Sequence, residues 1–170
     1  KPDRRQRQMC IRDRLEDFKC STSVLLNITP DHLDRHGTME GYIRAKQRIF
    51  MHQGLEDTAV IGVDNPHTQQ TLNQLLESKT IGNILPISSQ TQLEHGVSVV
   101  NNSCHIAVAT RRESFDLGPI PRLPGVHNAE NIAAAVAATL SYEIPSSILH
   151  EAIHSFPGLP HRLQLSLIHI

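Results

Sequence analysis

Residues 23–66 decide the fold class: SVLLNITPDHLDRHGTMEGYIRAKQRIFMHQGLEDTAVIGVDNP. Two apolar runs in this stretch, residues 23–28 and 58–63, lack the alternation of half-exposed strands and are typical of buried parallel strands. Between them, Thr38 is placed to cap a helix from Met39 to about His52. The DNP that ends the stretch suits the start of another helix, because proline is favoured in the first helical turn. Strand, helix, strand, helix predicts an α/β layer with a parallel sheet.

Between Ile81 and Leu117 the pattern changes to shorter apolar segments. Turn-forming residues at 101–103 (NNS) and 111–113 (RRE) divide these segments, which predicts a small antiparallel meander at the edge of the domain. Asn128 is expected to cap an Ala-rich helix. The fold class is therefore α/β, with a partial parallel (mixed) sheet flanked by helices. The meander strands are expected at residues 97–100, 106–108 and 115–117, and the last helix at about 146–154.

Composition restricts the class of protein. Hydrophobic residues make up 39% and charged residues 19% of the 170, as in a globular domain. The net charge of −1 argues against binding to nucleic acid or to a membrane surface. The three cysteines have no CxxC spacing, and no apolar run approaches the roughly 18 residues of a membrane span. We expect a cytoplasmic monomer with no nucleic-acid or membrane partner.

Both ends of the chain differ from the rest. Residues 1–14 are basic and show no periodicity, and residues 165–170 (LSLIHI) form an apolar end without a turn or a cap before it. We expect these two segments to pack little against residues 15–164, which we assign to one domain.

Acidic residues and a histidine follow the first predicted strand, namely Asp31, His32 and Asp34. In open α/β sheets, ligands bind beyond the carboxyl ends of the strands. Carboxylate and imidazole groups together can hold a divalent cation, although a solvated turn has the same composition. These residues alone leave a metal site and an ordinary loop both open.

Lys46 falls on the apolar face of the predicted helix, four residues after Tyr42 and three before Ile49. Lysine is seldom buried without a partner. Its stem can lie along the core while the ammonium reaches solvent. Alternatively, it is a functional amine that burial shifts toward the neutral form.

Two further segments carry polar residues beside turns. In LPGVHNAEN, Asn128 and Asn131 lie at the start of the Ala-rich helix, where their amides either bind a nucleotide base or cap the helix. Capping accounts for Asn128 but leaves Asn131 without a role. In FPGLPHRLQ, Arg162 suits contact with a phosphate or ribose, and is equally typical of a surface turn.

Taken in order, these segments resemble the Mur ligases, the ATP-dependent amino-acid ligases of peptidoglycan synthesis. The similarity covers NITPDHLDRHGTMEGYIRAKQRIF and LPGVHNAENIAAAVAA, and runs from about Val24 to Gln164. Within the family, GVHN and FPGLPHR are similar to the ligases that add D-glutamate, whereas the tripeptide-forming members typically read FN and PGR. The resemblance implies part of a central ATP-binding domain.

The resemblance also implies a reaction and roles for residues. ATP would phosphorylate the carboxylate of UDP-N-acetylmuramoyl-L-alanine, and the amine of D-glutamate would attack the acyl phosphate. By motif match, His32 would be a ligand of Mg²⁺, and Lys46 would be a carbamylated lysine that helps to hold a second metal ion. Asn131 would contact adenine, with Asn128 beside it, and Arg162 would reach the phosphates. Asn27 and Asp31 would support the ligands.

The sequence lacks three parts that the family normally has. No GxxxxGK[ST] loop occurs in the chain, and this is the element that holds the phosphates of ATP. The family's acidic metal ligand and its third domain are also not recognisable. We therefore expect this chain alone to be inactive. The alternatives are part of a tripeptide-forming ligase, part of a folylpolyglutamate synthase, or a non-catalytic nucleotide-binding remnant.

Overall fold

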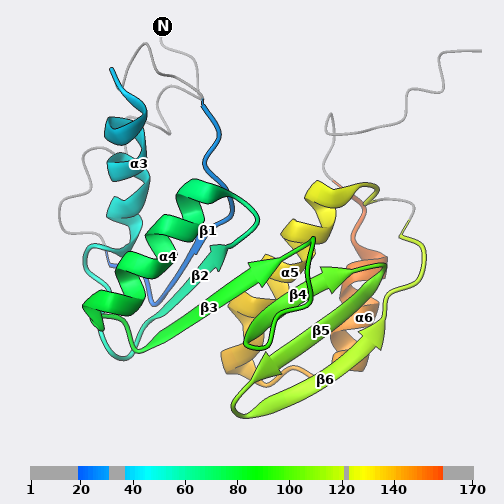
Figure 1. Cartoon of the computed structure of the whole chain (residues 1–170). Helices are drawn as coiled ribbons and strands as arrows, with labels where there is room; N and C mark the ends of the chain where they lie inside the picture. The colour runs from blue at the N-terminus through cyan, green and yellow to red at the C-terminus, as the bar shows by residue number, and fades with distance from the viewer. Residues whose placement is uncertain (1–18, 31–36, 121–122, 159–170) are drawn as a thin grey trace, which may run out of the picture. The chain divides into compact units, whose positions relative to one another are not determined.

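The computed structural model of the chain describes residues 19–30, 37–120 and 123–158 (Figure 1). The chain divides into two compact units, residues 1–87 and residues 88–170. Each unit is described here by itself. The predicted terminal segments, 1–14 and 165–170, lie outside the described residues, and the domain limits 15–164 stay a prediction.

Parallel strands and two helices make up the described part of the first unit. Thr22 pairs with Thr58 and Thr58 with Asn83, so that three strands run side by side in the same direction. Helices follow the first and second strands, as the sequence predicts (Figure 1). The elements are β1 (Thr22–Leu25), α3 (Met39–Gln47), the 3₁₀ turn η1 (Arg48–Phe50), β2 (Thr58–Gly62), α4 (Pro66–Ser78) and β3 (Asn83–Ser88).

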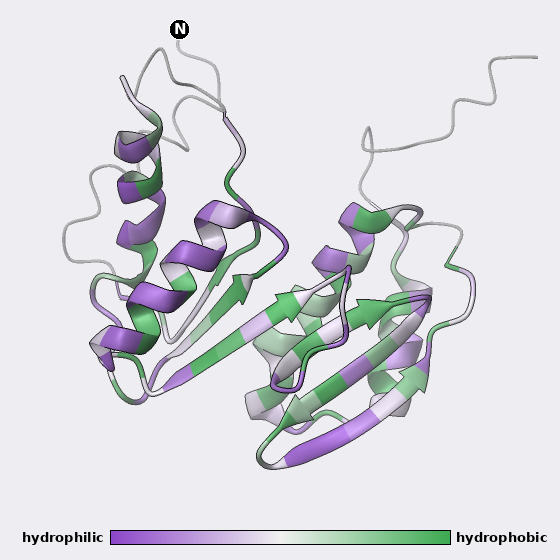
Figure 2. Ribbon diagram, in the orientation of Figure 1, coloured by the Kyte–Doolittle hydropathy of each residue, from purple (hydrophilic) through white to green (hydrophobic). Residues whose placement is uncertain are grey.

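A hydrophobic core lies between these strands and the helices. Ala59 and Ile61 of β2 are completely buried, and they belong to one cluster with Tyr42 of α3 and Leu72 of α4. Figure 2 shows the complementary pattern, with hydrophobic strands and hydrophilic residues on the outward sides of α3 and α4. Burial of one apolar stripe per helix therefore holds both helices on the sheet.

Two boundaries in the first unit differ from the prediction. β1 ends at Leu25 instead of continuing to Ile28, although Ile28 is still only 1% exposed. The helix changes to a 3₁₀ turn at Arg48 instead of running to His52. Burial and backbone pairing are separate properties, so an apolar run overestimates the length of a strand. The capping role of Thr38 is confirmed, because Gly41 N donates to its Oγ1 at 3.1 Å.

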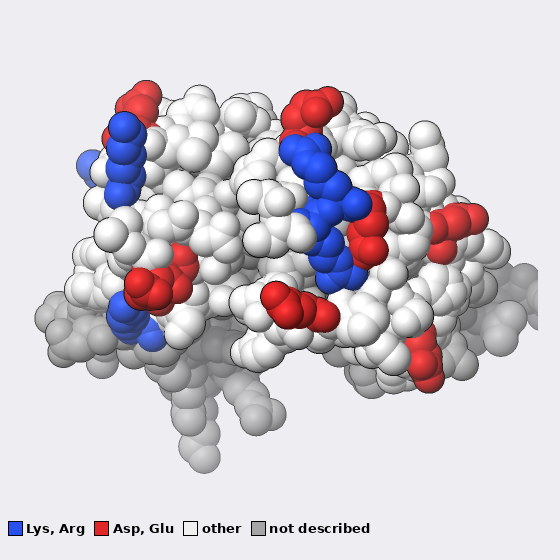
Figure 3. Space-filling view, turned by 90° about the horizontal axis from the view of Figure 1, so that it is seen from below, with Lys and Arg blue, Asp and Glu red and all other residues white. Residues whose placement is uncertain are grey.

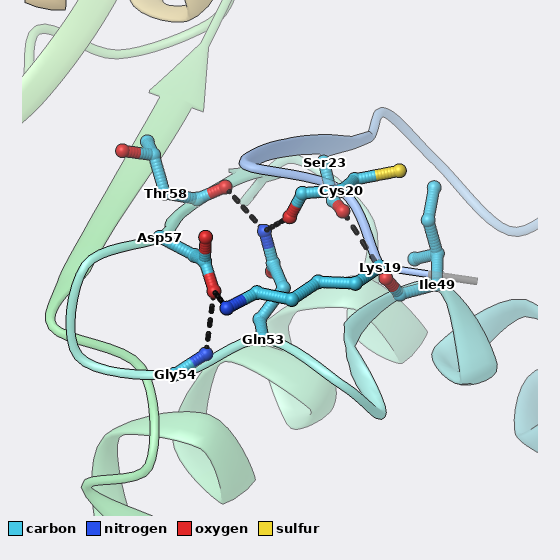
Figure 4. A network of polar contacts seen from close by, with 8 residues as sticks. All are labelled: Lys19, Cys20, Ser23, Ile49, Gln53, Gly54, Asp57 and Thr58. Atoms are coloured by element: carbon cyan, nitrogen blue, oxygen red, sulfur yellow. Dashed lines mark hydrogen bonds and ion pairs between the residues drawn. The ribbon is translucent and has the colours of Figure 1, made fainter. Parts of the chain in front are cut away.

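A polar network fixes the start of β1 beside the start of β2 (Figure 4). The Gln53 side-chain Nε2 donates to Cys20 O at 3.1 Å and to Thr58 O at 2.9 Å. Asp57 Oδ2 accepts from Gly54 N at 2.7 Å and lies 2.9 Å from Lys19 Nζ. The Gly54 hydrogen bond, and then the Lys19 ammonium, hold the pKa of Asp57 below its usual value.

The second unit contains the predicted antiparallel meander. Its three strands are hydrogen-bonded in sequence, with Gly96 opposite Ala107 and Ser103 opposite Asp116. Two helices lie against the same side of these strands (Figure 1). The elements are β4 (Gly96–Val100), β5 (Ser103–Val108), β6 (Arg111–Asp116), α5 (Val126–Thr139), the 3₁₀ turn η2 (Leu140–Tyr142) and α6 (Ser146–Ser155).

The turn predictions in the meander have mixed outcomes. Asn101 and Asn102 both have positive φ, of 50° and 61°, as a tight hairpin turn requires. The turn predicted at 111–113 is wrong, because these residues begin β6. Arg111 and Glu113 lie on the same face of the strand and pair with each other, and Arg111 Nη1 also donates to Ile144 O at 2.7 Å. A strand accommodates charged residues when they find such partners.

The predicted fold class is confirmed as α/β with strands of both kinds. The sequence interpretation omitted β3, a third parallel strand, by placing the whole of 81–117 in the meander. Cys20 and Cys104 are free thiols, and burial raises the pKa of Cys104 to about 12. None of the helices formed by the described residues is both long enough and apolar enough to cross a bilayer.

Candidate functional site

Asn65 connects the carboxyl ends of the first two parallel strands. Its Nδ2 donates to Ile28 O at 3.1 Å, while its Oδ1 accepts from His67 N at 3.0 Å and from Thr68 N at 3.4 Å. One side chain thus caps α4 and holds the segment that leaves β1. Asn65 is not among the predicted site residues, although an Asn directly before a Pro at the start of a helix is a recognisable capping signal.

One contact between η1 and β1 indicates which end of β1 lies nearer to Lys46. Ser23 Oγ donates to Ile49 O at 3.1 Å, which places η1 beside the start of β1. Since α3 runs opposite to β1 (Figure 1), the residues of α3 before Ile49, Lys46 among them, lie further toward the carboxyl end of β1 than this contact does. In open α/β sheets, ligands bind at that end of the strands.

The side chain of Lys46 follows the apolar stripe of α3. Its Nζ lies 5.2 Å from the ring centroid of Tyr42, a cation–π distance. Tyr42 is only 6% exposed, whereas Lys46 is half-buried. The predicted placement of Lys46 with Tyr42 is confirmed. Its role, as a snorkelling ammonium or as a functional amine, stays a prediction.

Neighbouring contacts fix the rotation of α3. The Gln47 side-chain Nε2 donates to Thr71 Oγ1 and to Gln74 Oε1 of α4, both at 3.0 Å. In the first turn of α3, hydrogen bonds to its own backbone N–H and to Thr38 hold the pKa of Glu40 below its usual value. The end of the helix that carries Lys46 is thus attached to α4.

The first turn of α5 differs from the prediction at Asn128. The helix begins at Val126, directly after Gly125, so Asn128 is inside the helix and is not its N-cap. Its Nδ2 instead donates back to Pro124 O at 2.8 Å, and Asn131 Nδ2 lies 3.4 Å from Asn128 Oδ1. Gly125 is the N-cap residue and has a positive φ of 90°, which glycine adopts readily. The helix therefore begins at Val126 without a side-chain cap.

Both asparagines border a groove of about 840 Å³ between α5 and α6. Its walls are mostly apolar, with Ile132 and Val136 on one side and Leu149 and Ile153 on the other. The groove is large enough for a flat aromatic base, and the two amides supply polar groups at its margin. The structure thus brings together Asn128 and Asn131, as the sequence predicts.

Several of the predicted site residues have no described position. His32, Asp31 and Asp34, and likewise Arg162, lie outside the described residues. Among residues 19–30, 37–120 and 123–158, no three His, Cys, Asp or Glu side chains gather as a metal cluster. The predicted metal and phosphate contacts of His32 and Arg162 therefore stay predictions.

The face drawn in Figure 3 carries charges of both signs. A short strip of lysine and arginine side chains is bordered there by aspartate and glutamate. This distribution agrees with the net charge of −1 of the sequence. It provides no broad basic surface on that face of the kind that nucleic acids require.

Comparison with known proteins assigns the family. Residues 6–139 match the model of the Mur ligase middle domain. The UDP-N-acetylmuramoylalanine--D-glutamate ligase of Caulobacter sp. (strain K31) is 44% identical over 153 residues, which are 89% of this chain and 32% of the relative. The chain therefore spans about a third of the length of this curated relative.

Solved structures agree on the fold. The UDP-N-acetylmuramoyl-L-alanyl-D-glutamate--2,6-diaminopimelate ligase has a TM-score of 0.64 at 24% identity, covering 88% of this chain and 31% of that one. E. coli FolC in complex with DHPP and ADP has a TM-score of 0.56 at 24% identity, covering 86% and 32%. The family model extends over most of the chain and the fold agrees with it, and the chain belongs to the Mur ligase family.

Proposed function

We propose that this chain is part of the ATP-binding central domain of a ligase that joins D-glutamate to UDP-N-acetylmuramoyl-L-alanine. The observation that carries the proposal is the 44% identity, over 89% of the chain, to a relative with that name. The position of Lys46 on α3, toward the carboxyl end of β1 from the Ser23–Ile49 contact, supports it. We further propose that the complete enzyme acts as a monomer in the cytoplasm.

The proposed reaction has two steps. The carboxylate of UDP-N-acetylmuramoyl-L-alanine attacks the γ-phosphate of ATP, which forms an acyl phosphate and releases ADP. The D-glutamate amine then attacks the acyl carbon, and phosphate leaves as the amide bond forms. Both steps concentrate negative charge on phosphate oxygens, and Mg²⁺, when bound, would neutralise that charge.

Lys46 fits a metal site only in a modified form. An ammonium repels a cation, whereas a carbamate formed from the neutral amine and carbon dioxide is an anion with two oxygen donors, the ligands that Mg²⁺ prefers. The half-buried position beside Tyr42 limits solvation of the amine and keeps its stem on the helix face. We propose that carbamylated Lys46 and His32 hold the metal, with Asn27 and Asp31 orienting them.

For the nucleotide, we propose that Asn131 contacts the adenine, with Asn128 beside it, and that Arg162 contacts the phosphates. The groove beside the two asparagines supports this, because its apolar walls suit a flat base and an amide can both donate and accept hydrogen bonds. Asn128 uses both ends of its amide, because its Nδ2 donates to Pro124 O and its Oδ1 accepts from Asn131 Nδ2. The Oδ1 of Asn131 takes part in neither bond, which makes Asn131 the better base contact.

Rival functions differ in substrate. A tripeptide-forming ligase would use a substrate that already carries glutamate, and a folylpolyglutamate synthase would use a folate. The solved neighbours include the 2,6-diaminopimelate ligase and E. coli FolC, but at 24% identity their likeness concerns the fold alone. The curated relative that is 44% identical favours the D-glutamate reaction. A non-catalytic remnant would show no turnover with any of these substrates.

The test is to read the complete coding region that contains this sequence and to assay its product. We expect an upstream GxxxxGK[ST] loop, and ATP-dependent phosphate release only when UDP-N-acetylmuramoyl-L-alanine and D-glutamate are both present. The 170-residue chain by itself should release none, because backbone donors for the phosphates are missing from its sequence. Turnover with a folate or with a glutamate-containing substrate instead would refute the proposal.

A further inference from the structure

Two histidines on α6 face each other one turn apart. The rings of His150 and His154 are stacked, with centroids 4.3 Å apart and planes at 29°. Residues four apart lie on the same face of a helix, and two histidines at this spacing are a known metal-binding arrangement. Both side chains are half-buried, so each is restrained but accessible to a solvent-borne ion.

A hydrogen bond determines which nitrogen of His154 is available. His154 Nε2 lies 2.7 Å from Leu117 O, at the end of the strand β6. A carbonyl oxygen only accepts, so Nε2 carries the proton, and the neutral ring has its lone pair on Nδ1. Metal-bound histidines usually donate their other ring N–H to a carbonyl or carboxylate in this way, which orients the ring and increases its basicity. His154 is thus oriented before any metal binds, whereas the His150 ring has to turn out of the stack for one of its nitrogens to reach the same ion.

We propose that His150 and His154 form a binding site for a divalent transition-metal ion of the Zn²⁺ class, with Nδ1 of His154 and one ring nitrogen of His150 as ligands. Imidazole favours Zn²⁺, Ni²⁺ and Cu²⁺, and not Mg²⁺, which prefers oxygen ligands. With two protein ligands, water occupies the other positions, so the site is open and exchangeable. Both histidines belong to the second unit, whereas Lys46 belongs to the first.

Binding at this site stabilises the packing of α6. The Leu117 hydrogen bond exists only when α6 lies against the end of β6, so the ligand geometry belongs to the folded state. An ion that binds the folded state preferentially raises its stability by mass action. We expect ZnCl₂ to raise the unfolding midpoint of the chain.

Calorimetric titration of the 170-residue chain with ZnCl₂ tests the affinity. His150→Ala removes one ligand and leaves the bond to Leu117 intact. His154→Gln removes the other ligand, while its amide can still donate to Leu117 O. We expect each to weaken Zn²⁺ binding at this site at least tenfold. The control is His95→Ala, an exposed histidine in the loop before β4, which should leave the affinity unchanged.

Nitrogen NMR of the histidine rings in the unaltered chain identifies the ligand atoms and does not depend on any variant folding. We expect the His154 Nδ1 resonance to shift on addition of ZnCl₂, together with one nitrogen of His150, while Nε2 of His154 keeps its proton. The proposal would be overturned if ZnCl₂ shifted the nitrogen resonances of neither ring. It would also be overturned if both substitutions left the affinity for Zn²⁺ unchanged. Coordination through Nε2 of His154 would overturn it as well.

Discussion

The Nζ atom of Lys46 lies 5.2 Å from the ring centroid of Tyr42, one turn earlier on α3. The contact keeps the lysine stem on the buried side of the helix, because Tyr42 is only 6% exposed. A lysine whose only purpose is solubility has no need of this position. The relationship therefore bears directly on the proposed role of Lys46 as a carbamate.

Replacing Lys46 should abolish the ligase activity of the complete enzyme. We expect Lys46→Ala to lower kcat by about 100-fold or more, because charge stabilisation in the transition state is lost. Lys46→Arg should be equally inactive, since a guanidinium cannot form the carbamate. A short carboxylic acid should partly restore turnover in Lys46→Ala by supplying the missing oxygen ligand. Full activity of the untreated alanine variant, measured by phosphate release, would end the carbamate hypothesis.

Asn131 and Asn128 should respond differently to substitution in the complete enzyme. Asn131→Ala should raise the KM for ATP by about tenfold, which corresponds to loss of roughly one hydrogen bond. Asn128→Ala should mainly lower stability, by about 1 kcal/mol, because it loses the bond to Pro124 O. Steady-state kinetics with varied ATP separate the two. Equal KM values for Asn131→Ala and the unaltered enzyme would contradict the adenine contact.

Asn65 should contribute to stability through two separable interactions. Asn65→Ala should cost about 1–2 kcal/mol of unfolding free energy, as for loss of an N-cap together with a buried hydrogen bond. Asn65→Asp keeps the capping oxygen but loses the donor to Ile28 O. Its unfolding free energy should therefore lie between that of the unaltered chain and that of Asn65→Ala. Urea unfolding of the 170-residue chain measures both. An aspartate variant as unstable as alanine would show that capping contributes little.

Gly82 should tolerate no side chain. A Cβ at this position would lie 1.8 Å from Leu55 O, a backbone atom that cannot move aside alone. We expect Gly82→Ala to destabilise the chain by about 1–3 kcal/mol or more, as overpacking does. Gly54→Ala is the matched control, because its nearest neighbour would be Asp57 Oδ2 at 3.9 Å, an ordinary contact. Similar unfolding midpoints for the two variants would contradict the clash.

Asp57 should make stability depend on acid pH. Its pKa is lower in the folded state than in the unfolded one, chiefly because Gly54 N–H donates to it and then because of Lys19. The stabilisation is therefore present above the unfolded pKa, about 4, and is lost as pH falls through the folded pKa. Asp57→Asn should flatten this part of the pH–stability curve, whereas Glu77→Gln, an exposed residue on α4, should not. Unchanged steepness in the asparagine variant would contradict the assignment.

Local patterns predicted the positions of elements better than their ends. Thr38 was recognisable as a cap because its hydroxyl needs only an N–H three residues later, which is a purely local requirement. The charged segment at 111–113 was assigned to a turn because its partners, including Ile144 O, are distant in sequence. β3 was missed for a similar reason, since its parallel pairing with β2 joins residues 25 positions apart.

The sequence by itself determined the α/β class, the family and the stripe that Lys46 shares with Tyr42, because periodicity and motif spacing are properties of the chain alone. Only the tertiary structure decided where β1 stops, how Asn65 joins it to α4, and that His154 donates to Leu117 O. These features depend on groups brought together across 37 positions of sequence, as for Ile28 with Asn65 and Leu117 with His154. Local propensity contains no information about such contacts, which form only when the strands and helices pack.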